Sequence, residues 1–273
     1  MYSIIGYIQP KNKTFIENIF HKTKSDIGKG SNQIVGKTLV NALFEPHSKH
    51  SIIFDSTMYK MGGKVTTFNE YNSSKKNEVF ANTIKRLESY GDIMYLQHSK
   101  KDHIEYVKET STIPVISNDD TQYIQSLTEL YSIYSYFTHL KYLKILFVGD
   151  IKNSQRIVSL ISLITLFCTN KIFFLPYDNH EPDYNFLYDI ALNNGQCPAD
   201  MVIHPLDLNI SDYDVVYYVP SDSNTTTNSC INKDLFESVR KDSVLIQPET
   251  DKNNLINHEE DIKSAILHEL LEK

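Results

Sequence analysis

The sequence predicts an α/β protein built from two doubly wound, mainly parallel sheets. Short runs of β-branched and aromatic residues alternate with segments of helical period, which is typical of parallel sheets with helical crossovers. The alternation restarts after a long aromatic-rich helical segment at 125–140. With 273 residues, the chain is also large for one hydrophobic core and suits two domains of ordinary size.

The first half contains four expected strands separated by helical segments. Gly62-Gly63 is expected to end the first helix, because glycine adopts the left-handed backbone conformation without steric cost. Strands are predicted at 38–44, 64–68, 93–96 and 115–116, and helices at about 51–61 and 77–90.

The second half repeats this pattern after the helix at 125–140. Strands are predicted at 144–148, 171–175, 215–219 and 244–247, with a helix at 154–167 and an amphipathic helix at 259–271. We place the domain boundary near Thr138 to Tyr142. The predicted domains are 1–138, with 257–273 packing back on it, and 139–256.

Composition and charge exclude several classes of function. The formal net charge of −7 argues against a nucleic-acid-binding protein, since neutralising phosphates requires a basic surface. The most apolar stretch, Ile157 to Cys168, is too short to span a bilayer, and Met1 to Tyr7 lacks the features of a signal peptide. Three widely spaced cysteines (Cys168, Cys197 and Cys230) indicate reduced thiols. We therefore expect a cytoplasmic protein that binds neither nucleic acid nor membrane.

Several short motifs follow one another along the chain. They are Phe44-Glu45-Pro46, Met58 to Gly63, Ser73 to Glu78, Gly91 to Met94, Ile113 to Ile116, Gln122 to Gln125, Leu130 to Ile133, Val148 to Lys152 and Val158 to Leu160. In this order they resemble the motifs of the aspartate/ornithine carbamoyltransferase family, and the aspartate branch most closely. The resemblance runs from about Gly36 to Pro248. It implies a carbamoyl-phosphate-binding-like domain and an aspartate/ornithine-binding-like domain joined by a long interdomain helix.

The resemblance also implies a place for an anion. The family binds carbamoyl phosphate with an S-T-R-T loop at a helix N-terminus, where backbone N–H groups and the helix dipole favour negative charge. In this chain the loop contains Ser48, Lys49 and His50. Lys76 matches a loop lysine that the family lends to a neighbouring subunit, and Gln125 keeps an amide of the H-P-T-Q motif. These five residues form the predicted vestigial anion site.

Other positions of the motifs have lost the residues on which carbamoyl transfer depends. The family's arginines and histidine polarise the acyl donor and stabilise the developing oxyanion. The altered positions are Ser51, Gln97, Gln122, Gln155 and Pro220. Gln247 to Asp251 replace the H-P-L-P-R segment. The sequence therefore predicts a catalytically degenerate protein with no confident catalytic residue and no cofactor.

Three functional hypotheses remain open. The chain is a non-catalytic scaffold, as a homotrimer or as a hetero-oligomer with an active paralogue. Alternatively, it is an active but divergent transferase that uses Lys49, Lys76, Arg156 and His50. The third hypothesis is a site for a different small anionic ligand.

Isolated polar residues receive structural interpretations. His47 and His50 lack a third ligand for a metal site and are expected in an exposed loop. We expect His98 and His103 at the surface, and Asp119-Asp120 in a turn. We expect Glu259 to Asp261 at the start of a helix, where acidic groups complement the macrodipole.

Overall fold

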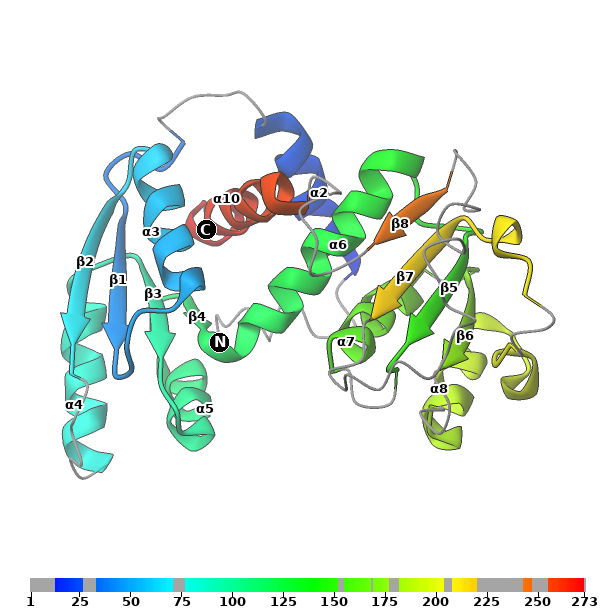
Figure 1. Cartoon of the computed structure of the whole chain (residues 1–273). Coiled ribbons are helices and arrows are strands. Elements are labelled where there is room, and N and C mark those ends of the chain that lie inside the picture. Colours follow the sequence, from blue (N-terminus) through cyan, green and yellow to red (C-terminus); the bar gives the residue numbers. More distant parts are fainter. Residues whose placement is uncertain are drawn as a thin grey trace. The chain divides into compact units, whose positions relative to one another are not determined.

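The computed structural model divides into two α/β units. It describes residues 13–26, 33–70, 77–151, 155–167, 169–176, 182–203, 208–219, 243–246 and 255–272. Unit 1 comprises Met1–Gln125 with Asn257–Lys273, and unit 2 comprises Ser126–Ile256. The helix α6 (Thr121–Phe137) begins in unit 1 and continues into unit 2 (Figure 1).

Unit 1 contains a parallel sheet in the order β2-β1-β3-β4. Its strands are β1 (Thr38–Leu43), β2 (Lys64–Asn69), β3 (Ile93–Gln97) and β4 (Val115–Ser117). Its helices are α2 (Lys13–Asp26), α3 (Lys49–Lys60), α4 (Asn77–Glu88), α5 (Lys101–Thr110) and α10 (Leu255–Leu271), with the 3-10 turn η1 (Asn118–Asp120).

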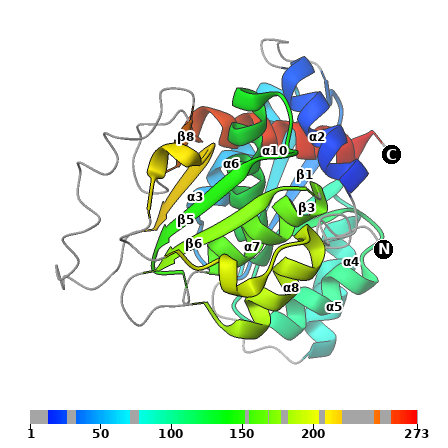
Figure 2. The same ribbon diagram turned by 90° about the vertical axis from the view of Figure 1, so that its right-hand side faces the viewer.

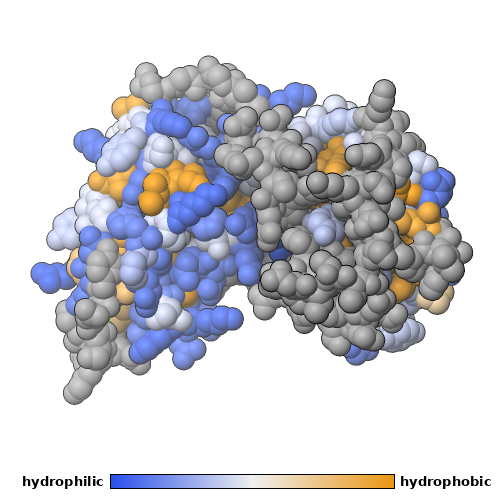
Figure 3. All heavy atoms as spheres, viewed as in Figure 1, coloured by the Kyte–Doolittle hydropathy of each residue, from blue (hydrophilic) through white to orange (hydrophobic). Residues whose placement is uncertain are grey.

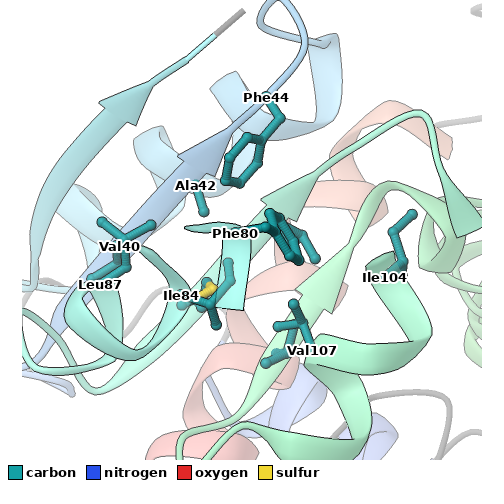
Figure 4. Close-up of a cluster of buried hydrophobic side chains, with 11 residues drawn as sticks. Val40, Ala42, Phe44, Phe80, Ile84, Leu87, Ile104 and Val107 are labelled. Carbon is teal, nitrogen blue, oxygen red and sulfur yellow. The ribbon is translucent and has the colours of Figure 1, made fainter. Parts of the chain in front are cut away.

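Alternate residues of the central strands face different helices, as the period of a strand requires. One face carries Val40, Ala42 and Phe44, which pack with side chains of α4 and α5 (Figure 4). On the other face, the ring of Tyr95 lies 5.5 Å from that of Phe54 in α3. The carboxyl ends of β1 and β3 therefore lie beside the start of α3.

Unit 2 contains a second parallel sheet in the order β6-β5-β7-β8. Its strands are β5 (Lys144–Gly149), β6 (Lys171–Pro176), β7 (Val215–Val219) and β8 (Val244–Ile246). Its further helices are α7 (Gln155–Ile164) and α8 (Tyr184–Asn194), and its 3-10 turns are η2 (Thr165–Phe167), η3 (Pro198–Asp200) and η5 (Ile210–Asp212).

Aromatic side chains form much of one face of the second sheet. The ring of Phe147 lies 5.7 Å from that of Phe174 and 5.4 Å from that of Tyr217, and Phe186 of α8 packs on Phe174. Figure 2 shows α7 and α8 beside β5 and β6. The opposite face is buried under Ile210 and its neighbours. Both sheets are thus covered by apolar side chains on their two faces, which parallel sheets require.

The α/β class and the two parallel sheets are confirmed. The eight predicted strands are present, and Gly62, with φ of +86°, follows the end of α3. The helices α2, α5 and α8 were not predicted, and α10 begins at Leu255. The division between the units lies within α6, whereas the sequence places a domain boundary after this helix; that boundary remains a prediction.

Asp120 lies in the 3-10 turn η1, as expected, and it is fully buried. Its carboxylate accepts hydrogen bonds from the Ser117 N–H at 2.7 Å and from the Lys108 Nζ at 3.0 Å. A buried carboxylate is tolerated only when it is paired and hydrogen-bonded, and this one satisfies both conditions. The turn is therefore present as expected, and the burial and pairing of Asp120 within it are additional findings.

Candidate functional site

The start of α3 is closed by its own side chains. Ser48 is the N-cap residue, and its Oγ accepts a hydrogen bond from the Ser51 N–H at 3.2 Å. In return, the Ser51 Oγ accepts one from the Ser48 N–H at 3.2 Å. This capping box satisfies two donors that a helix N-terminus otherwise offers to an anion. Ser51, one of the altered family positions, therefore has a structural role here.

The first turn of α3 also contacts α10. The Glu259 carboxylate lies 3.4 Å from Nδ1 of His50 and 4.0 Å from Nζ of Lys49. Glu259 also accepts a hydrogen bond from Lys263 at 2.8 Å. The hydrogen bond from His50, together with the charge of Lys263, lowers the pKa of Glu259 to about 2. The Lys49 ammonium and the His50 ring at the start of α3 are thus met by an acid of the same chain.

These contacts correct two expectations. His50 lies in the first turn of α3 and is partly buried, whereas His47 is exposed as expected. Glu259 lies in the second turn of α10, because the helix begins at Leu255. It therefore pairs with side chains of α3, and the expected role at the helix start was wrong.

Gln97 occupies the carboxyl end of β3, where the family motif has an arginine. It pairs with Leu43 in the sheet, is largely buried, and donates a hydrogen bond from Nε2 to the carbonyl oxygen of Pro46. Its Oε1 is buried without a hydrogen-bond partner. An uncharged amide that is tied to the loop before α3 cannot supply the forked cation that clamps a phosphate.

The remaining predicted site residues differ in how far the structure places them. Gln122 is exposed and Gln125 is half-buried, both in the first turns of α6. Gln155 is the first residue of α7. Lys76, the Gln155 side chain and Pro220 lie outside the described residues.

Arg156 is engaged by a buried acid within unit 2. Its guanidinium contacts the Glu129 carboxylate with Nη2 and donates a hydrogen bond from Nε at 2.6 Å. Glu129 also accepts a hydrogen bond from the Tyr217 hydroxyl at 3.0 Å. Burial raises the pKa of the Glu129 carboxyl, although the guanidinium opposes this rise. Arg156 is thus part of an interior network.

Arginine is scarce in this chain, which has only Arg86, Arg156 and Arg240. Arg86 is exposed near the end of α4, and Arg240 lies outside the described residues. The part of unit 1 that the structure describes therefore places no guanidinium at the start of α3.

His98 and His103 form a pair behind β1, contrary to the expectation that both lie at the surface. His98 is buried between Phe44 and Phe80, and its Nε2 lies 2.9 Å from Nδ1 of His103. The Lys100 N–H donates to Nδ1 of His98 at 2.9 Å, so the neutral ring carries its proton on Nε2. Burial, with the nearby His103, lowers the pKa of His98 to about 4.

This pair predicts a loss of stability in mild acid. The unfolded state binds a proton at His98 near pH 6.5, whereas the folded state binds it only near pH 4. The free energy of unfolding should therefore fall as the pH is lowered from about 6.5 to 4. We expect a smaller fall in His98→Asn, measured by urea unfolding at several pH values. His21→Asn, at an exposed position of α2, is the control; equal pH dependence in both variants contradicts the prediction.

Two further classes of site are not found in the part of the chain that the structure describes. No group of three or more His, Cys, Asp or Glu side chains is arranged to hold a metal ion among the described residues. No described helix has the length and apolar character to cross a membrane. Figure 3 shows mostly hydrophilic residues on the coloured surface of unit 1, with a small hydrophobic area.

Comparison with known proteins finds sequence matches for the N-terminal half of the chain. Residues 12–135 match the family model described as the carbamoyl-P binding domain of aspartate/ornithine carbamoyltransferase. The aspartate carbamoyltransferase catalytic subunit of Thermococcus kodakarensis is 36% identical over 101 residues, which cover 35% of this chain and 33% of that protein. The corresponding subunit of Clostridium botulinum is 32% identical over 123 residues, covering 42% and 40%. These matches span well under half of each relative.

The solved structures extend the likeness to the whole fold. The catalytic subunit of M. jannaschii aspartate transcarbamoylase has a TM-score of 0.75 at 21% identity, over 95% of each chain. Aspartate transcarbamoylase from Trypanosoma cruzi, bound to N-(phosphonacetyl)-L-aspartic acid, has a TM-score of 0.70 at 20% identity, over 94% of this chain and 92% of that chain.

The two parallel sheets and the helix between them define a two-domain carbamoyltransferase fold. Residues 12–135 are similar to the carbamoyl-P binding domain of the aspartate/ornithine carbamoyltransferase family, which the motifs of the sequence resemble.

Sequence reasoning missed two acids, Glu259 and Glu129, that contact the candidate site residues His50 and Arg156. Glu259 and Lys263 stand four residues apart, a spacing typical of an ion pair on one helix, and that signal was available. Glu129 is an acid within the apolar helical stretch at 125–140, which is itself a sign of a buried partner. The partner residues, His50 and Arg156, are distant in sequence and could not be assigned from spacing.

Proposed function

We propose that this protein is a non-catalytic carbamoyltransferase-like protein that acts as a scaffold or oligomerisation partner and retains a weakened anion site at the start of α3. The observation that carries the proposal is the absence of a guanidinium at that helix start within the described residues of unit 1. Ser48, Lys49, His50, Lys76 and Gln125 are the proposed residues of the weakened site.

The state of the other candidate groups supports this proposal. Carbamoyl transfer depends on donors that are free to stabilise charge as it develops on the acyl donor. Gln97 is neutral and donates a hydrogen bond to the carbonyl oxygen of Pro46, and the guanidinium of Arg156 donates a hydrogen bond to Glu129. The alternative of an active, divergent transferase assigned catalytic roles to Arg156 and His50, and both already have partners.

An exposed face of α3 supports association with another chain. Ile52 and Tyr59, which stand seven residues apart on this helix, are 58% and 59% exposed. Large apolar side chains at this spacing lie on one side of a helix and can pack against a partner. The proposed assembly is a homotrimer, or a hetero-oligomer with an active paralogue.

Binding of the bisubstrate compound N-(phosphonacetyl)-L-aspartic acid tests the proposal. A ligand that binds only the folded state, present at a concentration of 100 times its Kd, stabilises the folded state by about 2.7 kcal/mol. We expect no saturable rise in the melting temperature at millimolar compound, with the Trypanosoma cruzi enzyme as a positive control. Saturable stabilisation favours the active alternative. We also expect a trimer by light scattering, and a monomer at all concentrations contradicts the scaffold.

A further inference from the structure

The contact between α10 and α3 has the composition of an occupied anion site. One carboxylate, that of Glu259, lies against three nitrogen-bearing side chains: Nζ of Lys263 at 2.8 Å, Nδ1 of His50 at 3.4 Å and Nζ of Lys49 at 4.0 Å. Two of these groups belong to the first turn of α3, where the helix dipole already favours negative charge.

The surroundings of Glu259 favour a permanent contact. Lys263 is fully buried, and its Nζ lies 5.0 Å from the centre of the Phe54 ring. A buried ammonium requires a counter-charge, and Glu259 is the acid that the structure places against it. The Glu259 carboxylate is only 14% exposed, so it cannot easily leave for solvent.

An external phosphate at the start of α3 would meet unfavourable conditions. It would compete with Glu259 for Lys49 and His50, and it would bring a second negative charge close to the first. Like charges at such distances repel, and the repulsion is stronger in a partly buried site than in water. The Ser48 and Ser51 N–H groups are also taken by the capping box.

We propose that Glu259 is a built-in anion that occupies the cationic start of α3 and determines that this site rejects external phosphate. The inference deepens the proposed function, on which it rests, because it assigns the weakness of the anion site to one residue. The Glu259 carboxylate takes the place of an external anion at the start of α3.

Charge removal at Glu259 provides the test. Glu259→Gln keeps an oxygen that accepts the Lys263 hydrogen bond but loses the negative charge. We expect the affinity for inorganic phosphate to rise about tenfold or more, because the like charge is gone while Lys49 and Lys263 remain. The readouts are isothermal titration calorimetry and the phosphate dependence of the melting temperature, at constant ionic strength set with sodium chloride.

Matched controls separate this effect from a general change of charge. Glu260→Gln removes the same charge from the next residue, which pairs with the exposed Lys60, and should leave phosphate affinity unchanged. Adding Lys49→Ala to Glu259→Gln should abolish the gain. An equal rise in both single variants, or no rise in a folded Glu259→Gln protein, overturns the inference.

A second variant is needed if Glu259→Gln unfolds because Lys263 has lost its counter-ion. If circular dichroism shows that Glu259→Gln is unfolded, the double variant Glu259→Gln/Lys263→Met removes the buried cation as well, and its phosphate affinity is compared with that of Lys263→Met alone, above which we expect it to rise. The failure of the inference and that of the proposed function are distinguishable. Carbamoyl transfer by the unaltered protein contradicts the proposed function, whereas an unchanged phosphate affinity in the variants, with no transfer by the unaltered protein, contradicts only the role of Glu259.

Discussion

Replacing Glu129 with alanine should destabilise unit 2 by about 3–5 kcal/mol, a typical cost of removing one partner from a buried ion pair. The Glu129 side chain is 2% exposed and binds both the guanidinium of Arg156 and the hydroxyl of Tyr217. The substitution leaves the guanidinium without its counter-charge and the hydroxyl without its acceptor. We expect this loss in the free energy of unfolding measured with urea.

Two further variants define the origin of that loss. Asp189→Ala removes an exposed acid from α8 of the same unit and should change stability by less than about 0.5 kcal/mol. Glu129→Leu combined with Arg156→Met replaces the pair by apolar groups and should recover much of the stability, since such replacements are often neutral. A Glu129→Ala protein within about 1 kcal/mol of the unaltered one contradicts the structural role of this network.

Under the proposed function, Arg156 would be a poor substitute for the family's arginine, which the motif places one residue earlier, and the Glu129 network supplies the reason. A guanidinium whose Nε and Nη2 both face a carboxylate has fewer donors left and a neutralised charge. Its role is to hold α6, α7 and β7 of unit 2 together.

Local patterns in the sequence were sufficient to predict most strands and several helices. Buried parallel strands such as β5 and β7 are continuous apolar runs, and Gly62-Gly63 mark the end of α3. The helices α2 and α5 were overlooked although both carry buried apolar residues at helical spacing, Phe15, Ile16, Ile19 and Phe20 in α2 and Ile104 and Val107 in α5. The helix α8 was missed because Tyr184, Tyr188 and Leu192 lie on its exposed side, which obscures the usual contrast between its faces.

The candidate site was predictable by position more than by environment. The motif order located Ser48, Lys49 and Gln97 around the first turn of α3. It could not reveal that Glu259 faces this turn, because such contacts depend on how the distant helix α10 packs. His98 was misjudged for the same reason, since Phe44 and Phe80 bury it through tertiary contacts.

The largest effect predicted for the reaction itself is the absence of carbamoyl transfer. Loss of a single oxyanion donor commonly reduces the rate about 100- to 1000-fold. Here Ser51, Gln97 and Gln122 occupy positions where the family motifs have arginine or histidine. Such losses are not additive, but even the smallest combination should place turnover at least about 1000-fold below that of an active family member.

A direct assay of carbamoyl-aspartate formation tests this claim most closely. The purified chain should be mixed with carbamoyl phosphate and aspartate at saturating concentrations, beside the M. jannaschii catalytic subunit as the active reference. The proposal predicts no product above the enzyme-free reaction. Turnover of about 1 per second or faster, which is ordinary for an enzyme, would contradict it and show that other side chains have replaced the lost guanidinium groups.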